Sequence, residues 1–278
     1  AASDVYKRQQ LDILESIRWI AVDHLKETTP ELKWNKWLAT SGTFIALRVD
    51  MKPFDDVRVR RALNLAVNQQ EIVDKFYGGN AELMAYPQHP EFGEYFEPLE
   101  EMPASIKNLF SYDPIEARRL LDEAGVPEGF TFSMQVCSCS PSQMDLVPLL
   151  ESYLDKVGVK VKIQPMEYAS FLSAMTTKTH GPGYMLASGH TNPITSIRKS
   201  FVTGQTWNPS QYSDPQLNEE VRLLHLERDE EKRIKIIRRL TRRVLDDAPY
   251  IWLPTAYVHT AWWPCLLYTS PSPRDVEE

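Results

Sequence analysis

Hydrophobic and polar positions along the chain follow helical and strand periods in turn. Apolar residues alternate with polar ones over 130–136 and again over 159–163, which predicts two strands. Between them, 143–157 has the spacing of an interrupted helix that ends at Gly158. Because strand, helix and strand follow one another in that order, we expect a parallel pair of strands joined by a right-handed crossover.

Two helix starts are especially clear. Asp55 or Asp56 can cap a helix whose apolar side chains recur at spacings of three and four. Asp113 is followed by Pro114 and, at the third position, by Glu116, an arrangement typical of a capped helix with proline in its first turn. The remaining expected elements are helices over 11–38, 168–175, 216–226 and 230–245, strands over 43–49, 184–187 and 249–253, and irregular loops over 85–103 and 189–204.

Composition and charge narrow the class of protein. The chain has 278 residues, 31 Lys and Arg against 38 Asp and Glu, and a formal charge of -7, so no overall positive field would attract nucleic acid. No stretch approaches the roughly 20 consecutive apolar residues that span a bilayer, and the start lacks the pattern of a signal peptide. We expect a globular protein that acts as a monomer without nucleic acid or cofactor.

Three cysteines are too few for a disulfide framework. Cys137 and Cys139 are alternate residues, so on a strand they would project from one face as small core or edge residues. A zinc site that adds His180 and His190 is the alternative, although the spacing matches no compact ligand motif.

Both ends of the chain differ in character from the interior. Residues 1–9 and 265–278 contain AASDVYKRQ and CLLYTSPSPRD, which resemble translated sequencing-adapter sequence, and we expect neither segment to belong to the fold. A flexible Pro-rich tail is the alternative for the second segment.

Four strings, in order, carry a resemblance to a known family. They are PFDDVRVRRALNLAVN at 53–68, YDPIEARRLLDEAGVPEGF at 112–130, the LxxVGVKVxIQ run around Gly158, and NPSQYSDPQLNE at 208–219. Together they resemble the extracellular solute-binding proteins of family 5, which includes the oligopeptide, dipeptide and nickel binding components of ABC importers.

The resemblance implies an α/β fold of the type II periplasmic binding protein kind, in which two lobes close on a solute by hinge motion. It implies that 43–253 form the C-terminal lobe, a mixed sheet flanked by helices, and that 10–42 are a remnant of the N-terminal lobe. Residues 254–264 would be the return crossing, so the chain would be a truncated two-lobe protein. The parent protein would be periplasmic or extracellular, or anchored by a lipid, and would deliver its solute to a membrane permease.

The resemblance also suggests ligand contacts. Tyr168, at the start of the short helix after the IQ strand, is suited to stacking on a solute. Loop residues would add further contacts, and we expect Tyr168, His190 and Trp207 to line one open cleft. The expected ligand-binding set is Tyr168, Tyr184, His190, Thr191, Asn192, Trp207 and Asn208.

The solute itself is not fixed by the resemblance. Peptide-binding members carry a Trp and then an Asp that pairs with the peptide amino group, whereas Leu186 and Gly189 stand at the matching positions here. An unpaired buried ammonium is costly, so a hydroxylated or zwitterionic solute such as a short sugar suits this chain better than a peptide N-terminus. The alternative function is a hydrolase whose catalytic groups meet only in space, since no catalytic motif is present.

Overall fold

A five-stranded sheet organises most of the chain. The computed structural model describes residues 12–189 and 192–264, so the two end segments discussed above lie outside the described residues. The strand order is β6-β5-β7-β3-β8. The strands are β3 (Ser41–Leu47), β5 (Phe130–Cys137), β6 (Val159–Met166), β7 (Gly183–Gly189) and β8 (Tyr250–Trp252). β5 is parallel to β6 and to β7, which confirms the predicted crossover pair, and β3 is antiparallel to β7 and β8.

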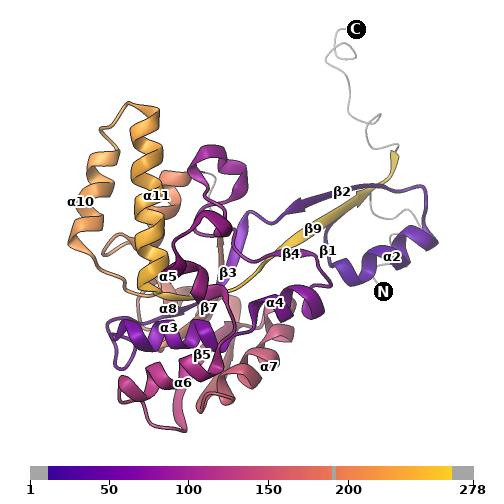
Figure 1. Cartoon of the computed structure of the whole chain (residues 1–278). Helices are drawn as coiled ribbons and strands as arrows, with labels where there is room; N and C mark the ends of the chain where they lie inside the picture. The colour runs from indigo at the N-terminus through magenta and orange to yellow at the C-terminus, as the bar shows by residue number, and fades with distance from the viewer. Residues whose placement is uncertain (1–11, 190–191, 265–278) are drawn as a thin grey trace.

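Helices cover both faces of this sheet. They are α3 (Val57–Ala66), α4 (Gln69–Glu71), α5 (Ala104–Lys107), α6 (Pro114–Glu123), α7 (Pro141–Asp155), α8 (Tyr168–Thr176), α9 (Pro193–Phe201), α10 (Pro215–Leu224) and α11 (Glu230–Asp247), with a π-helical turn at Ile72–Phe76 and 3-10 turns at Pro90–Tyr95, Leu99–Glu101 and Asn108–Phe110. α3, α6 and α7 lie on one side and α10 and α11 on the other (Figure 1). Side chains of β3 alternate accordingly, with Ile45 and Leu47 in one buried cluster and Phe44 and Ala46 in the other.

The two predicted helix caps are confirmed. The Asp56 side chain accepts a hydrogen bond from the backbone N–H of Arg58 at 2.8 Å. The Asp113 side chain accepts one from the backbone N–H of Glu116 at 2.9 Å. Each cap accepts a hydrogen bond from a backbone N–H that would otherwise be unpaired at the helix end. The cap therefore fixes the residue at which the helix begins.

A second, smaller sheet extends away from the first (Figure 1). It contains β1 (Ile13–Ile17), β9 (Thr255–Trp262) and β2 (Lys33–Leu38) in that order, with β4 (Ala81–Glu82) also paired to β9, and α2 (Trp19–Thr28) packs beside it. The expectation of a helix over 11–38 is therefore wrong in part. Trp34 and Trp37 belong to β2, which pairs with β9 more than two hundred residues along the chain, so a long-range partner decides the local structure.

The loop expected over 189–204 is also corrected, because α9 occupies much of it. Asn192 caps this helix and Pro193 opens it, while Ile197 and Phe201 are fully buried against the sheet. Ile197 and Phe201 are four residues apart, a spacing typical of the buried face of an amphipathic helix.

Two short crossings, close together, join strands of the two sheets directly. β2 leads to β3 through 39–40, and β8 leads to β9 through 253–254. The backbone N–H of Ala39 donates to the carbonyl of Ala256 at 3.0 Å, so the first crossing is hydrogen-bonded to the start of β9, directly after the second crossing. Paired crossings of this kind can act as a hinge between two bodies.

Candidate functional site

The carboxyl ends of three parallel strands meet at one edge of the five-stranded sheet. β5, β6 and β7 end at Cys137, Met166 and Gly189, and β3 begins at Ser41, directly opposite Gly189. In open α/β sheets, ligands bind outside this edge. The edge faces the two crossings and the smaller sheet.

A hollow of about 240 Å³, here called the crevice, lies at this edge. It is formed by the crossings, the first turn of α7, the end of β7 and the segment that joins β1 to α2. The lining residues are Ser16, Ile17, Arg18, Trp19, Ala39, Ser41, Thr43, Phe76, Tyr77, Ser140, Ser142, Gln143, Ala187, Ala256, Tyr257 and Val258. The crevice therefore has walls from both sheets.

Hydroxyl, amide and aromatic groups dominate the crevice lining. Arg18 is the charged group among the described lining residues, and no carboxylate lines the hollow within this part of the chain. Arg18 pairs with Asp145 of α7 at 2.8 Å, and both side chains are about half exposed. This ion pair connects the smaller sheet to the larger body, although an exposed pair of this kind contributes only about 0–1 kcal/mol to stability.

Aromatic side chains form a fixed wall of the crevice. Trp19 Nε1 donates a hydrogen bond to the carbonyl of Phe76 at 3.1 Å. A Cβ on Gly78 would lie 2.8 Å from the Trp19 ring, and Gly78 has φ +56°, so glycine is needed both for space and for backbone conformation. Burial raises the pKa of Tyr77 to about 12, so its hydroxyl is neutral and can donate a hydrogen bond.

A second hollow of about 310 Å³ lies beside the end of β7. It is lined by Ala187, Ser188, Gly189, Lys199 and Trp207, and we call it the Trp207 hollow. Ala187 lines both hollows, so they flank the same strand end. The loop that carries Trp207 is held by Lys178, whose Nζ donates to the carbonyls of Gln205, Thr206 and Asn208 at 2.9, 2.7 and 3.0 Å.

Two residues of the expected ligand-binding set are buried within the fold. Tyr184 is 0% exposed, its ring stacks on Phe171, and its hydroxyl donates to the carbonyl of Phe171 at 2.5 Å. Asn208 is 1% exposed, donates from Nδ2 to the carbonyl of Tyr212 at 2.8 Å and accepts at Oδ1 from the Tyr212 N–H at 3.1 Å. Both side chains are used for hydrogen bonds inside the fold, and their role as ligand contacts stays a prediction.

The other expected residues occupy different surroundings. Trp207 is 38% exposed and lines the hollow named after it, while Tyr168 is 56% exposed at the start of α8 and lines neither hollow. Asn192 is exposed and caps α9, with Oδ1 accepting from the N–H groups of Ile194 and Thr195. His190 and Thr191 lie outside the described residues, so a single cleft containing Tyr168, His190 and Trp207 stays a prediction.

The two alternate cysteines are joined to each other. Cys137 ends β5 and is buried in the core, as expected for a small core residue, and it forms a disulfide with Cys139 that the sequence did not predict. Among residues 12–189 and 192–264, no group of three or more His, Cys, Asp or Glu side chains is placed to hold a metal ion. His180 is buried, its Nδ1 lies 2.9 Å from the Gly181 carbonyl, and its ring lies against Tyr184.

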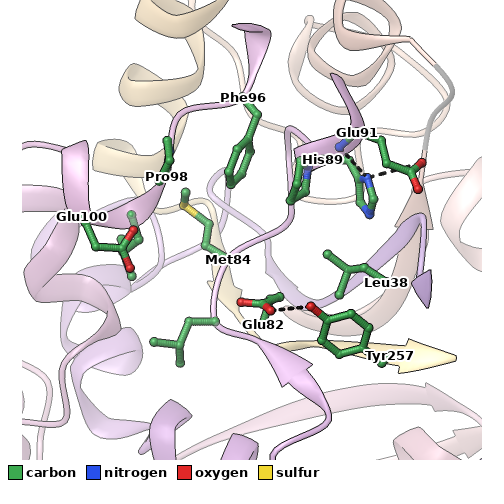
Figure 2. A pocket seen from close by; sticks show the side chains of 12 residues that line it. Leu38, Glu82, Met84, His89, Glu91, Phe96, Pro98, Glu100 and Tyr257 are labelled. Atoms are coloured by element: carbon green, nitrogen blue, oxygen red, sulfur yellow. Dashed lines mark hydrogen bonds and ion pairs between the residues drawn. The ribbon is translucent and has the colours of Figure 1, made fainter. Parts of the chain in front are cut away.

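Another hollow, of about 420 Å³, lies beside the crossings between β4 and the loop over 83–100. Figure 2 shows Glu82 hydrogen-bonded to Tyr257, and His89 next to Glu91. None of the ligand contacts expected from the sequence lines this hollow, and no residue of β5, β6 or β7 lines it, although Tyr257 lines both this hollow and the crevice.

Sequence reasoning missed most of the crevice. Arg18 and Trp19 were assigned to the interior of one long helix, so their position beside the crossings was not expected. Ser140 followed by Pro141 is a recognisable helix start and would have placed Ser142 and Gln143 at the strand end. No sequence pattern indicated that Phe76 and Tyr77 line the crevice.

A match to a family model shows the class of protein to which the chain belongs. Residues 1–208 match the family described as bacterial extracellular solute-binding proteins, family 5 Middle, so the chain belongs to that family. Among residues 12–189 and 192–264, every helix is too short or too polar to cross a membrane.

Individual relatives agree with this assignment. The di/tripeptide-binding protein 1 of Pseudomonas aeruginosa is 33% identical over 46% of this chain and 23% of its own length. The heme-binding protein A of Haemophilus influenzae is 27% identical over 83% of this chain and 42% of its own. The oligopeptide-binding protein AppA of Bacillus subtilis, solved with a nonapeptide, superposes with a TM-score of 0.81 at 18% identity over 95% of this chain and 54% of that one.

These likenesses confirm the expected fold class, a mixed α/β arrangement of the type II periplasmic binding protein kind. The chain spans about a quarter to two fifths of the length of these two curated relatives, and about half of the AppA structure.

Proposed function

We propose that the chain is part of the solute-binding component of an ABC importer, and that its crevice is one half of the solute site. The observation that carries the proposal is that the crevice is lined from both sheets beside the two crossings. A small rotation about the crossings would change its width, as in hinge closure around a ligand. On this view, 43–253 form one lobe, 10–42 belong to the other, and 254–264 are the return crossing.

The lining favours a solute with hydroxyl, amide or anionic groups. The described residues around the crevice and the Trp207 hollow include Arg18 and Lys199 but no carboxylate. A buried ammonium would lack a partner there and would lose several kcal/mol. An aspartate cannot be accommodated at position 189 on this backbone, because a Cβ on Gly189 would lie 2.2 Å from the Thr40 carbonyl oxygen.

This character supports a hydroxylated solute, such as a short sugar, over a solute with an ammonium group, such as a zwitterion or a peptide held by its N-terminus. Relatives of this chain have names for di/tripeptide, glutathione and heme binding, so the family spans solutes of very different chemistry. The family is one of solute-binding proteins and not of enzymes, so we do not retain the hydrolase alternative.

The proposed partner is a membrane permease that recognises the closed form. The location follows from this role: the periplasm or the outer face of the cytoplasmic membrane, with or without a lipid anchor. We propose a monomer, because a two-lobe site is completed within one chain.

Calorimetric screening of the full-length parent protein against sugars, amino acids and short peptides tests the proposal. Replacing Gln143, which lines the crevice, by alanine should weaken binding of the solute found by about five-fold, the value of roughly one hydrogen bond. Gln164→Ala, an exposed change on β6 outside the hollow, is the matched control and should leave binding unchanged. Equal losses in the two variants would contradict this site.

A further inference from the structure

The Cys137–Cys139 disulfide stands at the rim of the crevice. Cys137 is the last residue of β5, and the residue after Cys139 is Ser140, which lines the crevice immediately before α7 begins at Pro141. The bond therefore lies at the carboxyl end of a central strand, where this fold places its ligand. The proposed function makes no use of it.

The two sulfur-bearing residues differ sharply in access. Cys137 is 3% exposed and packs in the buried cluster that contains Phe44 and Tyr184. Cys139 is exposed. Because a thiolate must approach a disulfide sulfur directly, a molecule from solution reaches Cys139 and not Cys137.

The local fold has other supports than this bond. β5 pairs with β6 along its whole length, up to Cys137 opposite Met166. Beyond the strand, the N–H and the hydroxyl of Ser138 both donate to the carbonyl of Met166 at 2.9 Å. A disulfide that encloses a single intervening residue restrains little of the unfolded chain, since such stabilisation grows with loop length. The bond is thus exposed at Cys139, and the local fold has supports besides it; exposed disulfides are typically the labile ones.

The buried sulfur is suited to leave. The N–H of Cys139 already donates a hydrogen bond to Cys137 Sγ at 3.3 Å, and the 15-residue helix α7 begins just after this turn. A backbone donor and a nearby helix N-terminus both stabilise a developing thiolate. Burial in the apolar cluster opposes this effect and favours rapid protonation of the released sulfur.

We propose that this disulfide is a thiol-exchange site, at which a small organic thiol becomes covalently attached to Cys139 at the crevice rim. The thiolate of the incoming molecule attacks Cys139 Sγ, a new sulfur–sulfur bond forms to it, and the Cys137–Cys139 bond breaks. The electron pair of that bond goes to Cys137 Sγ, which takes a proton from solvent. One thiol is consumed and one is released, so no external oxidant or reductant is needed.

The neighbouring groups indicate which thiols fit. Ser140 directly follows Cys139 and lines the crevice with Ser142 and Gln143, which offer hydroxyl and amide groups, and Arg18 is the charged group among the described lining residues. A thiol with a polar or anionic body therefore suits the rim.

Mass mapping with 2-mercaptoethanesulfonate as the probe tests the proposal. The whole chain is used with Cys265, which lies outside the described residues, replaced by serine. After acid quenching, the adduct should be found on Cys139 with Cys137 as a free thiol, and it should form at least ten-fold faster than the chain unfolds under the same conditions. An adduct on Cys137, or a rate equal to that of unfolding, would overturn the proposal.

Single-cysteine variants provide a second test of the proposal. In the same background, Cys137→Ser keeps the exposed sulfur and should react with the symmetrical disulfide of the probe at least ten-fold faster than Cys139→Ser, which keeps the buried one. Equal rates in two folded variants would also overturn the proposal. If either variant fails to fold by circular dichroism, the mapping on the disulfide-bonded chain decides alone.

Discussion

The Lys178 side chain holds the loop that carries Trp207. Replacing this side chain should destabilise mainly that loop. Lys178 has φ +60°, and its Nζ donates to the carbonyls of Gln205, Thr206 and Asn208. Arg48 Nη1 donates to the Lys178 carbonyl at 3.1 Å and so fixes the backbone of the lysine as well. Burial, followed by the charge of Arg48, lowers the pKa of Lys178.

The size of the effect follows from these contacts. A hydrogen bond from a charged donor contributes about 1.5–3 kcal/mol. Because one partly exposed ammonium makes all the bonds, and the freed carbonyls regain water when the loop opens, we expect Lys178→Met to cost about 2 kcal/mol in total. The loss should appear as local opening of 205–208 before it appears as global unfolding.

Urea unfolding and amide hydrogen exchange measure the two parts separately. Lys178→Met should lower the free energy of unfolding by about 2 kcal/mol and raise exchange across 205–208. Lys162→Met, at an exposed lysine of β6 whose side chain makes no hydrogen bond or ion pair within the described residues, should change stability by at most about 0.5 kcal/mol. Equal effects of the two substitutions, or unchanged exchange over 205–208, would refute the reasoning.

Three further predictions concern buried contacts. Asn64→Leu should lower the free energy of unfolding, measured with denaturant, by about 3 kcal/mol, because it leaves the Tyr250 carbonyl and the Trp252 N–H unpaired in the core. A loss under about 1 kcal/mol would contradict this prediction. Gly189→Ala should lower the free energy of unfolding by about 1–3 kcal/mol, since the added Cβ would collide with the Thr40 carbonyl oxygen. An unchanged melting temperature would contradict the close packing of Gly189 against Thr40. Burial lowers the pKa of His180, so the unfolded chain binds a proton near pH 6.5 that the folded chain does not, and stability should fall as the pH drops below about 6.5. His180→Gln should reduce that fall, measured between about pH 7 and pH 5.5, and an identical fall would contradict the assignment.

The sequence predicted elements whose signals are local. The helix starts at Asp56 and Asp113 depend on side chains within three residues of the cap, and both are present. The β5-α7-β6 unit was predictable because its periods and its stop at Gly158 lie within one stretch of chain. Elements that depend on distant partners were not predictable in this way: β2 is a strand because β9 pairs with it.

The candidate site was harder to predict than the fold. Tyr184 and Asn208 have side chains suited to binding, yet their hydrogen-bonding groups serve Phe171 and Tyr212 within the core. Residue type alone does not show whether a polar group faces inward or outward. Trp19 reaches the crevice only through the arrangement of the two crossings, which no local pattern encodes.

A crystal structure of the full-length parent protein with its solute is the most direct measurement of the central claim. The solute should lie at the ends of β5, β6 and β7, within hydrogen-bond distance of Gln143 and against the Trp19 and Tyr77 wall. A solute bound instead in the hollow of Figure 2, or on the outer faces of α10 and α11, would contradict the assignment of the crevice.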